Sequence, residues 1–374
     1  APAFETGMLT IPEGAEITAV AAGLLGSSDA ADRFRVIPLV EGFADASTEA
    51  RVRILHAGAD APAVALDLGN DGTPEVPESS FGRFMDTGAE GVALPTGTEL
   101  YVGVWSGSSR VTAFTTPALA SGEYFLIATG LLASKANAAD GFGLLAVGPT
   151  GTIGLLRQDP LVYVLHTAPD APAVDVYVGG SETELVDNLS FGELSPPVQV
   201  PPAAYDLDIR VWDGGAVVAT VGTPELAAGE RYLAVASGFA LDNPSSFTLL
   251  PYREEFGAPG GALVRVVHAS PDAPTVDVGT WDGMTFTPVG PFTGLSFGNA
   301  SDGSGLDLAP GSLTIGVAPH TTTTPVATFD LTLSGGLSAF AVASGSITNK
   351  GETFRLLVVD TAASPWQVAE VLPN

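Results

Sequence analysis

The stretch Arg265-Val266-Val267-His268-Ala269-Ser270-Pro271-Asp272-Ala273-Pro274-Thr275-Val276 decides the fold, because the chain contains three versions of it. The two earlier versions start at Arg53 and Tyr163, and all three keep a histidine four residues before an Asp-Ala-Pro turn. The versions are spaced by 110 and then 102 residues. Repetition at such a period indicates a chain built from several copies of one structural unit.

Two further landmarks follow each version of this stretch in the same order. The first is Ser-Phe-Gly, at residues 80–82, 190–192 and 296–298. The second is an apolar run that closes each copy and ends in glycine, at Gly130, Gly238 and Gly345. Three landmarks in one order indicate three complete copies, which we expect to span residues 51–148, 160–254 and 262–360.

Each copy has the pattern of β-strands and turns, because its segments are short, rich in β-branched and aromatic residues, and separated by Gly, Pro, Asn and Asp. In one segment Leu207, Ile209 and Val211 alternate with charged residues, so one face packs while the other meets water. About seven such strands per 100 residues are typical of an immunoglobulin-like sandwich. The expected fold class is all-β: tandem immunoglobulin-like antiparallel β-sandwiches, with three complete repeats and an N-terminal half-repeat.

These landmarks resemble those of the bacterial and archaeal family known as domain of unknown function 4397, whose pattern His-Ala-Ser-Pro-Asp-Ala-Pro-x-Val-Asp-Val is nearest to His268–Val278. The resemblance covers nearly the whole chain. It implies secreted or surface-attached β-sandwich repeats with no agreed activity. The first copy departs from the pattern, because Ala65 stands where the other copies have Asp175 and Asp277. A function that needs this aspartate in every copy is therefore not expected.

The two ends of the chain look like partial copies. Residues 1–43 contain a match to the closing run and are expected to form the C-terminal half of a β-sandwich repeat. Residues 361–374 loosely match the strand that opens each copy and form a tail with a candidate donor strand. A half-sandwich and a spare strand together predict strand donation between chains. The expected assembly interface comprises Leu9, Ile11, Ile17, Val20, Trp366, Val368, Val371 and Leu372.

Two other interpretations of these ends stay open. In the first, residues 1–43 fold back onto the first complete repeat as extra strands. In the second, the chain is a processed or truncated piece of a longer protein. Head-to-tail donation would be a heterologous contact, which closes into rings or continues as a filament.

The composition disfavours several classes of partner. The 374 residues include 42 acidic and 14 basic ones, which gives a formal net charge of −28. Nucleic-acid binding depends on clustered Lys and Arg, and anionic membranes are disfavoured for the same reason. No apolar run approaches the roughly 18 residues of a membrane span. The chain has no cysteine, which excludes disulfides and thiolate metal sites, and its hydrophobic share of 45% excludes disorder.

Three of the four histidines occupy the same place in the three copies, and each precedes an aspartate by four residues. The pairs are His56 with Asp60, His166 with Asp170, and His268 with Asp272. One interpretation is a metal site or a general base oriented by a carboxylate. We favour a structural role, in which the ring hydrogen-bonds the Asp-Ala-Pro turn, because no nucleophile stands at a recognisable spacing. His320 stands apart in a loop and is expected to be exposed.

Acidic, glycine-rich turns are weak candidates for calcium, a cation that takes carboxylate and carbonyl oxygens. The candidate ligands are Asp67, Asp71, Asp213 and Asp302. The same sequences are ordinary hairpin turns, and none has the spacing of a known calcium loop. We therefore expect no catalytic residue and no cofactor, with calcium left open.

The sequence thus predicts a non-enzymatic extracellular structural repeat protein that assembles head to tail into a surface fibre, sheath or matrix by strand complementation. The alternative is a monomeric cell-surface binding module that recognises a carbohydrate or protein through its loops. A hydrolase that uses a His-Asp pair is a third hypothesis. The expected location is outside the cell or on its surface, after removal of an export signal. The expected partners are copies of the chain, together with a surface glycan or protein in the alternative.

Overall fold

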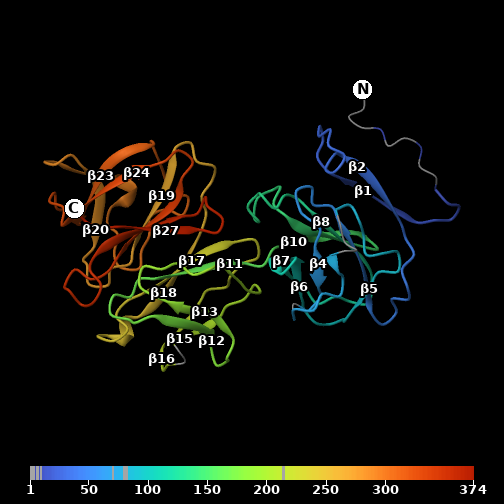
Figure 1. Cartoon of the computed structure of the whole chain (residues 1–374), viewed down its shortest axis with the longest axis horizontal. Helices are drawn as coiled ribbons and strands as arrows, with labels where there is room; N and C mark the ends of the chain where they lie inside the picture. The colour runs from blue at the N-terminus through green and yellow to red at the C-terminus, as the bar shows by residue number, and fades with distance from the viewer. Residues whose placement is uncertain (1–4, 6–7, 9–10, 70, 79–82, 213–214) are drawn as a thin grey trace. The chain divides into compact units, whose positions relative to one another are not determined.

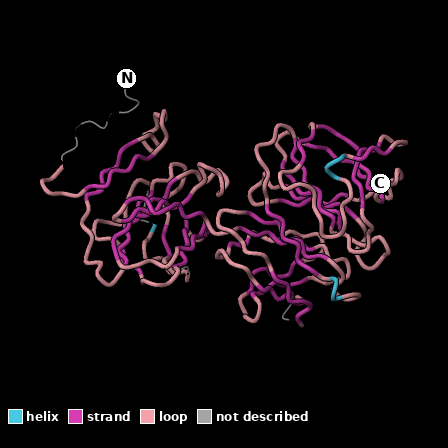
Figure 2. The backbone as a smooth tube through the Cα atoms, turned by 180° about the vertical axis from the view of Figure 1, so that it is seen from behind, coloured by secondary structure: helices cyan, strands magenta, loops and turns pink. Residues whose placement is uncertain are grey.

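The computed structural model describes the chain except for residues 1–4, 6–7, 9–10, 70, 79–82 and 213–214. The described residues form an all-β protein of small antiparallel and mixed sheets (Figure 1). Helical structure among them is limited to short 3-10 turns, such as Pro244–Ser246 and Gly290–Phe292 (Figure 2). No helix in this part of the chain is long and apolar enough to cross a membrane.

The chain divides into two compact units. The first comprises Ala1–Pro160 with the short segments Gln199–Pro202 and Ala227–Glu230. The second comprises Leu161–Val198, Ala203–Leu226 and Arg231–Asn374. The first complete sequence copy therefore belongs to the first unit, and most of the second copy and all of the third belong to the second unit.

In the first unit, the residues that the structure describes form a hairpin and two larger sheets. The hairpin pairs β1 (Ile17–Ala22) with β2 (Arg35–Val40). One larger sheet has the strand order β10-β9-β8-β3-β5, and the other has the order β4-β6-β7. Their strands are β3 (Ala50–His56), β4 (Ala65–Asp67), β5 (Val92–Leu94), β6 (Leu100–Ser106), β7 (Ser109–Thr116), β8 (Gly122–Thr129), β9 (Gly143–Gly148) and β10 (Gly151–Arg157). Ile54 and Leu126 of one sheet share an apolar core with Val104 and Phe114 of the other.

The described residues of the second unit form four sheets, two from each sequence copy. The second copy supplies the orders β14-β11-β17-β18 and β13-β12-β15-β16. Its strands are β11 (Leu161–His166), β12 (Val174–Val178), β13 (Glu184–Leu189), β14 (Val198–Gln199), β15 (Asp206–Val211), β16 (Val217–Gly222), β17 (Arg231–Ser237) and β18 (Thr248–Arg253). Val164 and Leu249 of the first of these sheets share an apolar core with Val176 and Ile209 of the other.

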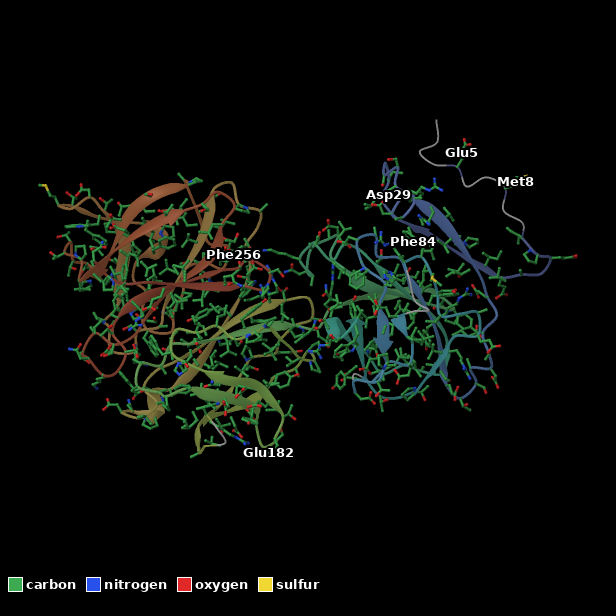
Figure 3. The ribbon with its side chains drawn as sticks, in the orientation of Figure 1. Glu5, Met8, Asp29, Phe84, Glu182 and Phe256 are labelled. Carbon is green, nitrogen blue, oxygen red and sulfur yellow. The ribbon has the colours of Figure 1, made fainter. Side chains whose placement is uncertain are left out.

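The third copy supplies the orders β22-β19-β25-β26-β27 and β21-β20-β23-β24. Its strands are β19 (Ala262–His268), β20 (Val276–Trp281), β21 (Phe286–Pro288), β22 (Leu306–Leu308), β23 (Gly311–Pro319), β24 (Ala327–Leu333), β25 (Ser338–Ser344), β26 (Arg355–Asp360) and β27 (Gln367–Val371). A further apolar cluster joins the two copies. It includes Leu165 and Val235 of the second copy, Val267 and Val342 of the third, and Phe256, which Figure 3 labels.

One strand pair in each copy is parallel, although the sequence predicted antiparallel sheets. The opening strand runs parallel to the closing strand in the pairs β3–β8, β11–β17 and β19–β25. Parallel neighbours need a long connection, and here that connection runs through the second sheet of the same copy. The sheets that contain these pairs are therefore mixed.

A glycine ends the closing strand in every copy because a side chain would not fit there. Gly130, Gly238 and Gly345 have φ of 88°, 102° and 84°, in the region that favours glycine. A Cβ on Gly238 would lie 2.2 Å from the Ser246 carbonyl oxygen. Gly23, which ends β1, has φ of 88° and the same conflict with the Arg33 carbonyl oxygen. The turn after β1 is thus built like the turn after each closing strand.

Candidate assembly site

The three repeated histidines each contact their own Asp-Ala-Pro turn. The ring Nε2 lies 2.7–3.1 Å from the carbonyl oxygen of the proline six residues on, which is Pro62, Pro172 or Pro274. The rings of His56, His166 and His268 are fully buried, and this burial lowers the pKa of each below 6.5. Since a carbonyl can only accept, Nε2 of each neutral ring carries the proton that it donates.

The aspartates of these pairs bind a different part of the chain, the loop after the closing strand. Asp170 accepts backbone N–H groups from Ala240, Leu241 and Asp242 at 2.7–2.9 Å. Asp60 and Asp272 each accept two N–H groups from the matching loops. The carboxylate therefore links the opening turn to a loop about 70 residues further on. The two side chains of each pair hydrogen-bond to separate partners, so the carboxylate does not orient the ring as a general base requires.

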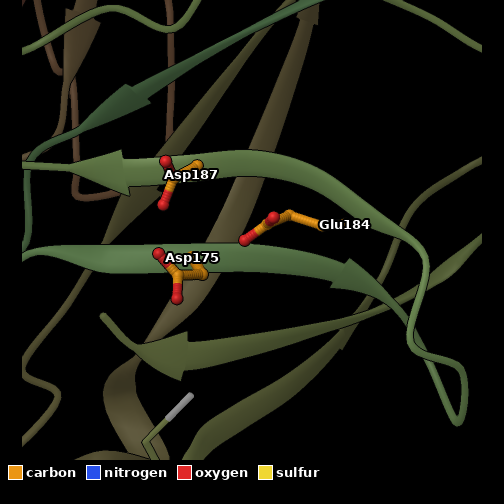
Figure 4. A group of neighbouring side chains, drawn as sticks. All are labelled: Asp175, Glu184 and Asp187. Atoms are coloured by element: carbon orange, nitrogen blue, oxygen red, sulfur yellow. The ribbon is translucent and has the colours of Figure 1, made fainter. Parts of the chain in front are cut away.

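An acidic cluster that the sequence did not single out lies in the second copy (Figure 4). Carboxylate oxygens of Asp175, Glu184 and Asp187 lie within 4.8 Å of one another. Asp175 is buried and accepts a hydrogen bond from the Asn188 N–H at 2.9 Å. Glu184 accepts one from the Tyr177 hydroxyl at 2.9 Å. The cluster offers oxygen ligands, but hydrogen bonds within the protein already engage two of its three carboxylates.

The third copy uses the matching aspartate in another way. Asp277 accepts hydrogen bonds from the Gly294 and Thr321 N–H groups and lies 2.7 Å from Nδ1 of His320. Burial opposes ionisation of Asp277, but these hydrogen bonds outweigh it and lower the pKa of its carboxyl group. His320, which we expected to stand apart, is thus half-exposed and paired with a carboxylate.

The predicted calcium ligands lie in turns that hydrogen bonds already close. Asp67 is fully buried and accepts the N–H groups of Asp71 and Gly72 at 3.0 and 2.7 Å. Asp302 accepts the N–H and the hydroxyl of Ser304. Asp213 lies outside the described residues. Each described turn is an aspartate-capped turn of the ordinary kind.

The hairpin packs one face on the first complete copy. Val20 and Leu39 form an apolar cluster with Leu55 of β3 and Ile127 of β8. The guanidinium of Arg35 lies 4.0 Å over the ring of Phe84, which Figure 3 labels, and Arg53 donates to the Val40 carbonyl at 2.6 Å. In the second unit, residues at the same positions of β17 and β18 pack on the third copy, with Val235 in place of Val20 and Tyr252 in place of Leu39.

The other face of the hairpin is entirely apolar and largely open. Its cross-strand pairs are Ile17 with Val40, Ala19 with Pro38, and Ala21 with Val36. Ala19, Ala21, Pro38 and Val40 are exposed. The residues that match Ala19, Ala21 and Val36 are buried in β8–β9, β17–β18 and β25–β26, and in β17–β18 they are Ala234, Ala236 and Leu249, at 3%, 1% and 6% exposure. The hairpin thus presents a core-type surface to solvent.

The two edges of the hairpin differ. Pro38 in β2 has no N–H to donate. The matching residue of β18 is Pro251, and β18 is likewise the edge strand of its sheet. The matching residues of β9 and β26 are Ala146 and Val358, and these strands carry β10 and β27 on that side. Proline within a strand belongs at an edge. The edge of β2 is therefore closed to further pairing, whereas β1 pairs only with β2 among the described residues.

The residues of the expected assembly interface lie in different environments. Val20 is buried against the first copy, Ile17 is on the open face, and Ile11 is 64% exposed. Trp366 is buried between the second and third copies, and Val368 packs against the same cluster. Val371 packs in the third copy, and Leu372 is 60% exposed. Leu9 lies outside the described residues. The tail strand β27 pairs antiparallel with β26, where β10 pairs with β9 in the first copy.

Repeated pairs of sheets, a buried histidine turn and a carboxylate that caps the closing loop define a class of tandem all-β repeat proteins. The family model described as Domain of unknown function (DUF4397) matches residues 160–279 and 262–371. The chain belongs to this family, as the landmarks around His268 predicted. No curated protein matches the chain.

Proposed function

We propose that the chain is a non-enzymatic extracellular structural repeat protein. In this proposal three immunoglobulin-like β-sandwiches and an N-terminal half-repeat assemble head to tail, by strand complementation, into a surface fibre, sheath or matrix. The observation that supports it is the open face of β1–β2, where Ala19 and Ala21 are exposed although their counterparts in all three complete copies are buried. An apolar sheet face beside an unpaired edge is a surface that proteins cover or pair.

The tail of a second copy is the donor in this proposal. β27 is an edge strand, paired on one side with β26. Among the described residues, the second sequence copy has no strand at that place, because its sheet ends at β18. A copy is therefore complete without such a strand, and when β27 leaves β26 it gives up the packing of two half-buried side chains, Val368 and Val371. The free edge of β1 is the place where it would pair.

The net charge of the chain should make its self-association depend on salt concentration. A net charge of −28 on each chain repels a second copy at low ionic strength. The Debye length is about 8 Å at physiological salt and about 3 Å at 1 M. Association through an apolar face is therefore expected to strengthen as salt is added.

Sedimentation velocity of the full chain and of Ala21→Arg, over a concentration series at 0.15 and 1 M salt, tests the proposal. Ala21 is exposed on the open face, so the substitution adds a charge there without entering a core. Met284→Arg makes the same change in charge at a residue that is 89% exposed in the other unit. We expect association by the parent and by Met284→Arg and its loss in Ala21→Arg. Equal association by all three would contradict the proposal.

A groove in the third copy favours a second candidate function, a surface binding module. It has a volume of about 700 Å³ and is lined by apolar side chains that include Val276, Ile347 and Phe354. Small-molecule sites commonly fall in the range of about 300–1,000 Å³. Screening the monomer against a glycan array tests it, with Ile347→Arg as the variant that should lose any saturable binding. No saturable binding to any glycan would remove the carbohydrate form of this candidate.

A further inference from the structure

The open side of the hairpin lacks three features that every complete copy has. The edge of β1 has no second neighbour among the described residues, and the outward face carries no second sheet. The third feature is an acceptor for the N–H groups of Leu25 and Gly26, two and three residues after Gly23, which donate to no acceptor in the described part of the chain. Leu25 is 67% exposed.

In the complete copies the opening part of the sequence supplies all three features. β19 pairs along the edge of β25, with Val266 opposite Ala341 and His268 opposite Ala343. The sheet that follows covers the apolar face, with Val276 and Val317 in the core beside Ala341 and Leu356. Asp272 then accepts the N–H groups of Ile347 and Thr348, two and three residues after Gly345, at 3.0 and 3.1 Å.

We propose that the hairpin is an acceptor for an otherwise unpaired opening half of a repeat, carrying the sequence His-x-x-x-Asp-Ala-Pro. The donor strand runs parallel to β1, with residues matching Val266 and His268 opposite Ala19 and Ala21. The donor aspartate accepts the N–H groups of Leu25 and Gly26. The inference rests on the proposed function, because it gives the same site a donor that competes with the tail of a second copy.

A second copy of the chain is a poor source of this segment. Its opening strands are paired on both sides: β3 lies between β8 and β5, β11 between β17 and β14, and β19 between β25 and β22. Its tail has no His-x-x-x-Asp-Ala-Pro sequence, so it can fill the edge but cannot supply the aspartate. The donor is therefore an opening half whose strand has an unpaired edge, which none of the three described opening strands has.

A labelled peptide with the sequence of residues 262–276 is the probe, titrated into the full chain and followed by fluorescence anisotropy. We expect saturable binding, and binding at least tenfold weaker for the peptide with Asp272→Asn. The chain variant Ala21→Arg should also bind at least tenfold more weakly, while Met284→Arg should bind as the parent does. Absence of saturable binding, or equal binding by Ala21→Arg, would overturn the inference.

Crosslinking tests the strand register, because the natural chain has no cysteine. Ala19→Cys in the chain should form a disulfide with the peptide that carries Val266→Cys, since directly opposed residues have the required Cα separation of about 4.4–6.8 Å. The peptide with Val267→Cys is the control, because its thiol points to the opposite face. Equal crosslinking by both peptides would overturn the proposed register.

The same peptide separates this inference from the proposed function. Peptide binding by a chain that stays monomeric at all concentrations would support the inference and contradict self-assembly. Self-association that the peptide neither joins nor inhibits would contradict the inference and leave self-assembly standing. Dissociation of assembled chains by the peptide, but not by its Asp272→Asn form, is the result that we expect.

Discussion

The ring of Trp366 stacks on the ring of Tyr163, with centroids 4.3 Å apart and planes within 9° of parallel. Trp366 precedes the tail strand, and Tyr163 lies in the opening strand of the second copy. Both side chains belong to the apolar cluster that joins the second and third copies. The tail is thus anchored at the junction between two copies, so the residues available for donation are those after Trp366.

Replacing this tryptophan is expected to weaken the second unit. Trp366→Ala leaves a cavity in a buried cluster. Such a change lowers the free energy of unfolding by about 3–5 kcal/mol. Trp212→Ala is the control, because Trp212 is 51% exposed, and it should cost less than about 1 kcal/mol. Urea denaturation followed by circular dichroism measures both. Equal losses would show that the junction does not depend on the stacked pair.

The aspartate that caps the closing loop is expected to hold that loop in place. Asp170→Ala leaves three N–H groups without their acceptor, and the loss at buried Ala240 should lower the free energy of unfolding by about 1–3 kcal/mol. Hydrogen exchange at Ala240, Leu241 and Asp242 should speed up by at least tenfold, while exchange in β12 should change little. Asp187→Ala, in an exposed part of the acidic cluster, is the matched control. Unchanged exchange in the loop would refute this role.

The glycine that ends the closing strand allows a sharp comparison. In Gly238→Ala the new Cβ lies 2.2 Å from a backbone oxygen, whereas in Gly180→Ala nothing lies within 4 Å, although both glycines have positive φ. Gly180→Ala should therefore lower the free energy of unfolding by about 1 kcal/mol. Gly238→Ala should lower it several times more. Thermal unfolding of the two variants measures the difference. Similar melting temperatures would mean that the turn after β17 can shift to make room.

The buried histidines predict a loss of stability in mild acid. An unfolded histidine has a pKa of about 6.5, and burial lowers the pKa of His56, His166 and His268 in the folded state. Below pH 6.5 the unfolded chain therefore binds protons that the folded chain does not, and the free energy of unfolding falls. Above pH 6.5 the rings are neutral in both states, so they cause no pH dependence.

Urea denaturation between pH 8 and pH 5.5 measures this effect. His166→Gln should reduce the dependence on pH. A parent chain that is as stable at pH 5.5 as at pH 8 would contradict the prediction.

The histidine turn could be predicted from the sequence because all of its parts are local. The ring and the proline carbonyl that it contacts are six residues apart, and the threefold repetition marked them. The partner of Asp170 could not be predicted in this way. Its loop lies about 70 residues further on, and the two meet only because the opening and closing strands pair in parallel.

Two further features, the acidic cluster and the open face of the hairpin, depend on strand register and could not be predicted from the sequence. Glu184 reaches Asp175 because Tyr177 pairs with Glu184 across β12 and β13, and no single stretch of sequence contains that information. The open face of the hairpin could not be assigned either. Both alternating sets in residues 17–22 are apolar or nearly so, with Thr18, Val20 and Ala22 in one and Ile17, Ala19 and Ala21 in the other. Packing on Leu55 and Ile127 decides which set is covered.

The most direct test of assembly through the hairpin is the mass and shape of the native chain in solution, by light scattering and negative-stain electron microscopy, with and without calcium. We predict rods or filaments with an axial repeat of three to four β-sandwiches, and their loss in Ala21→Arg. A monomer of 37.9 kDa at every concentration and salt tested would contradict assembly through the hairpin.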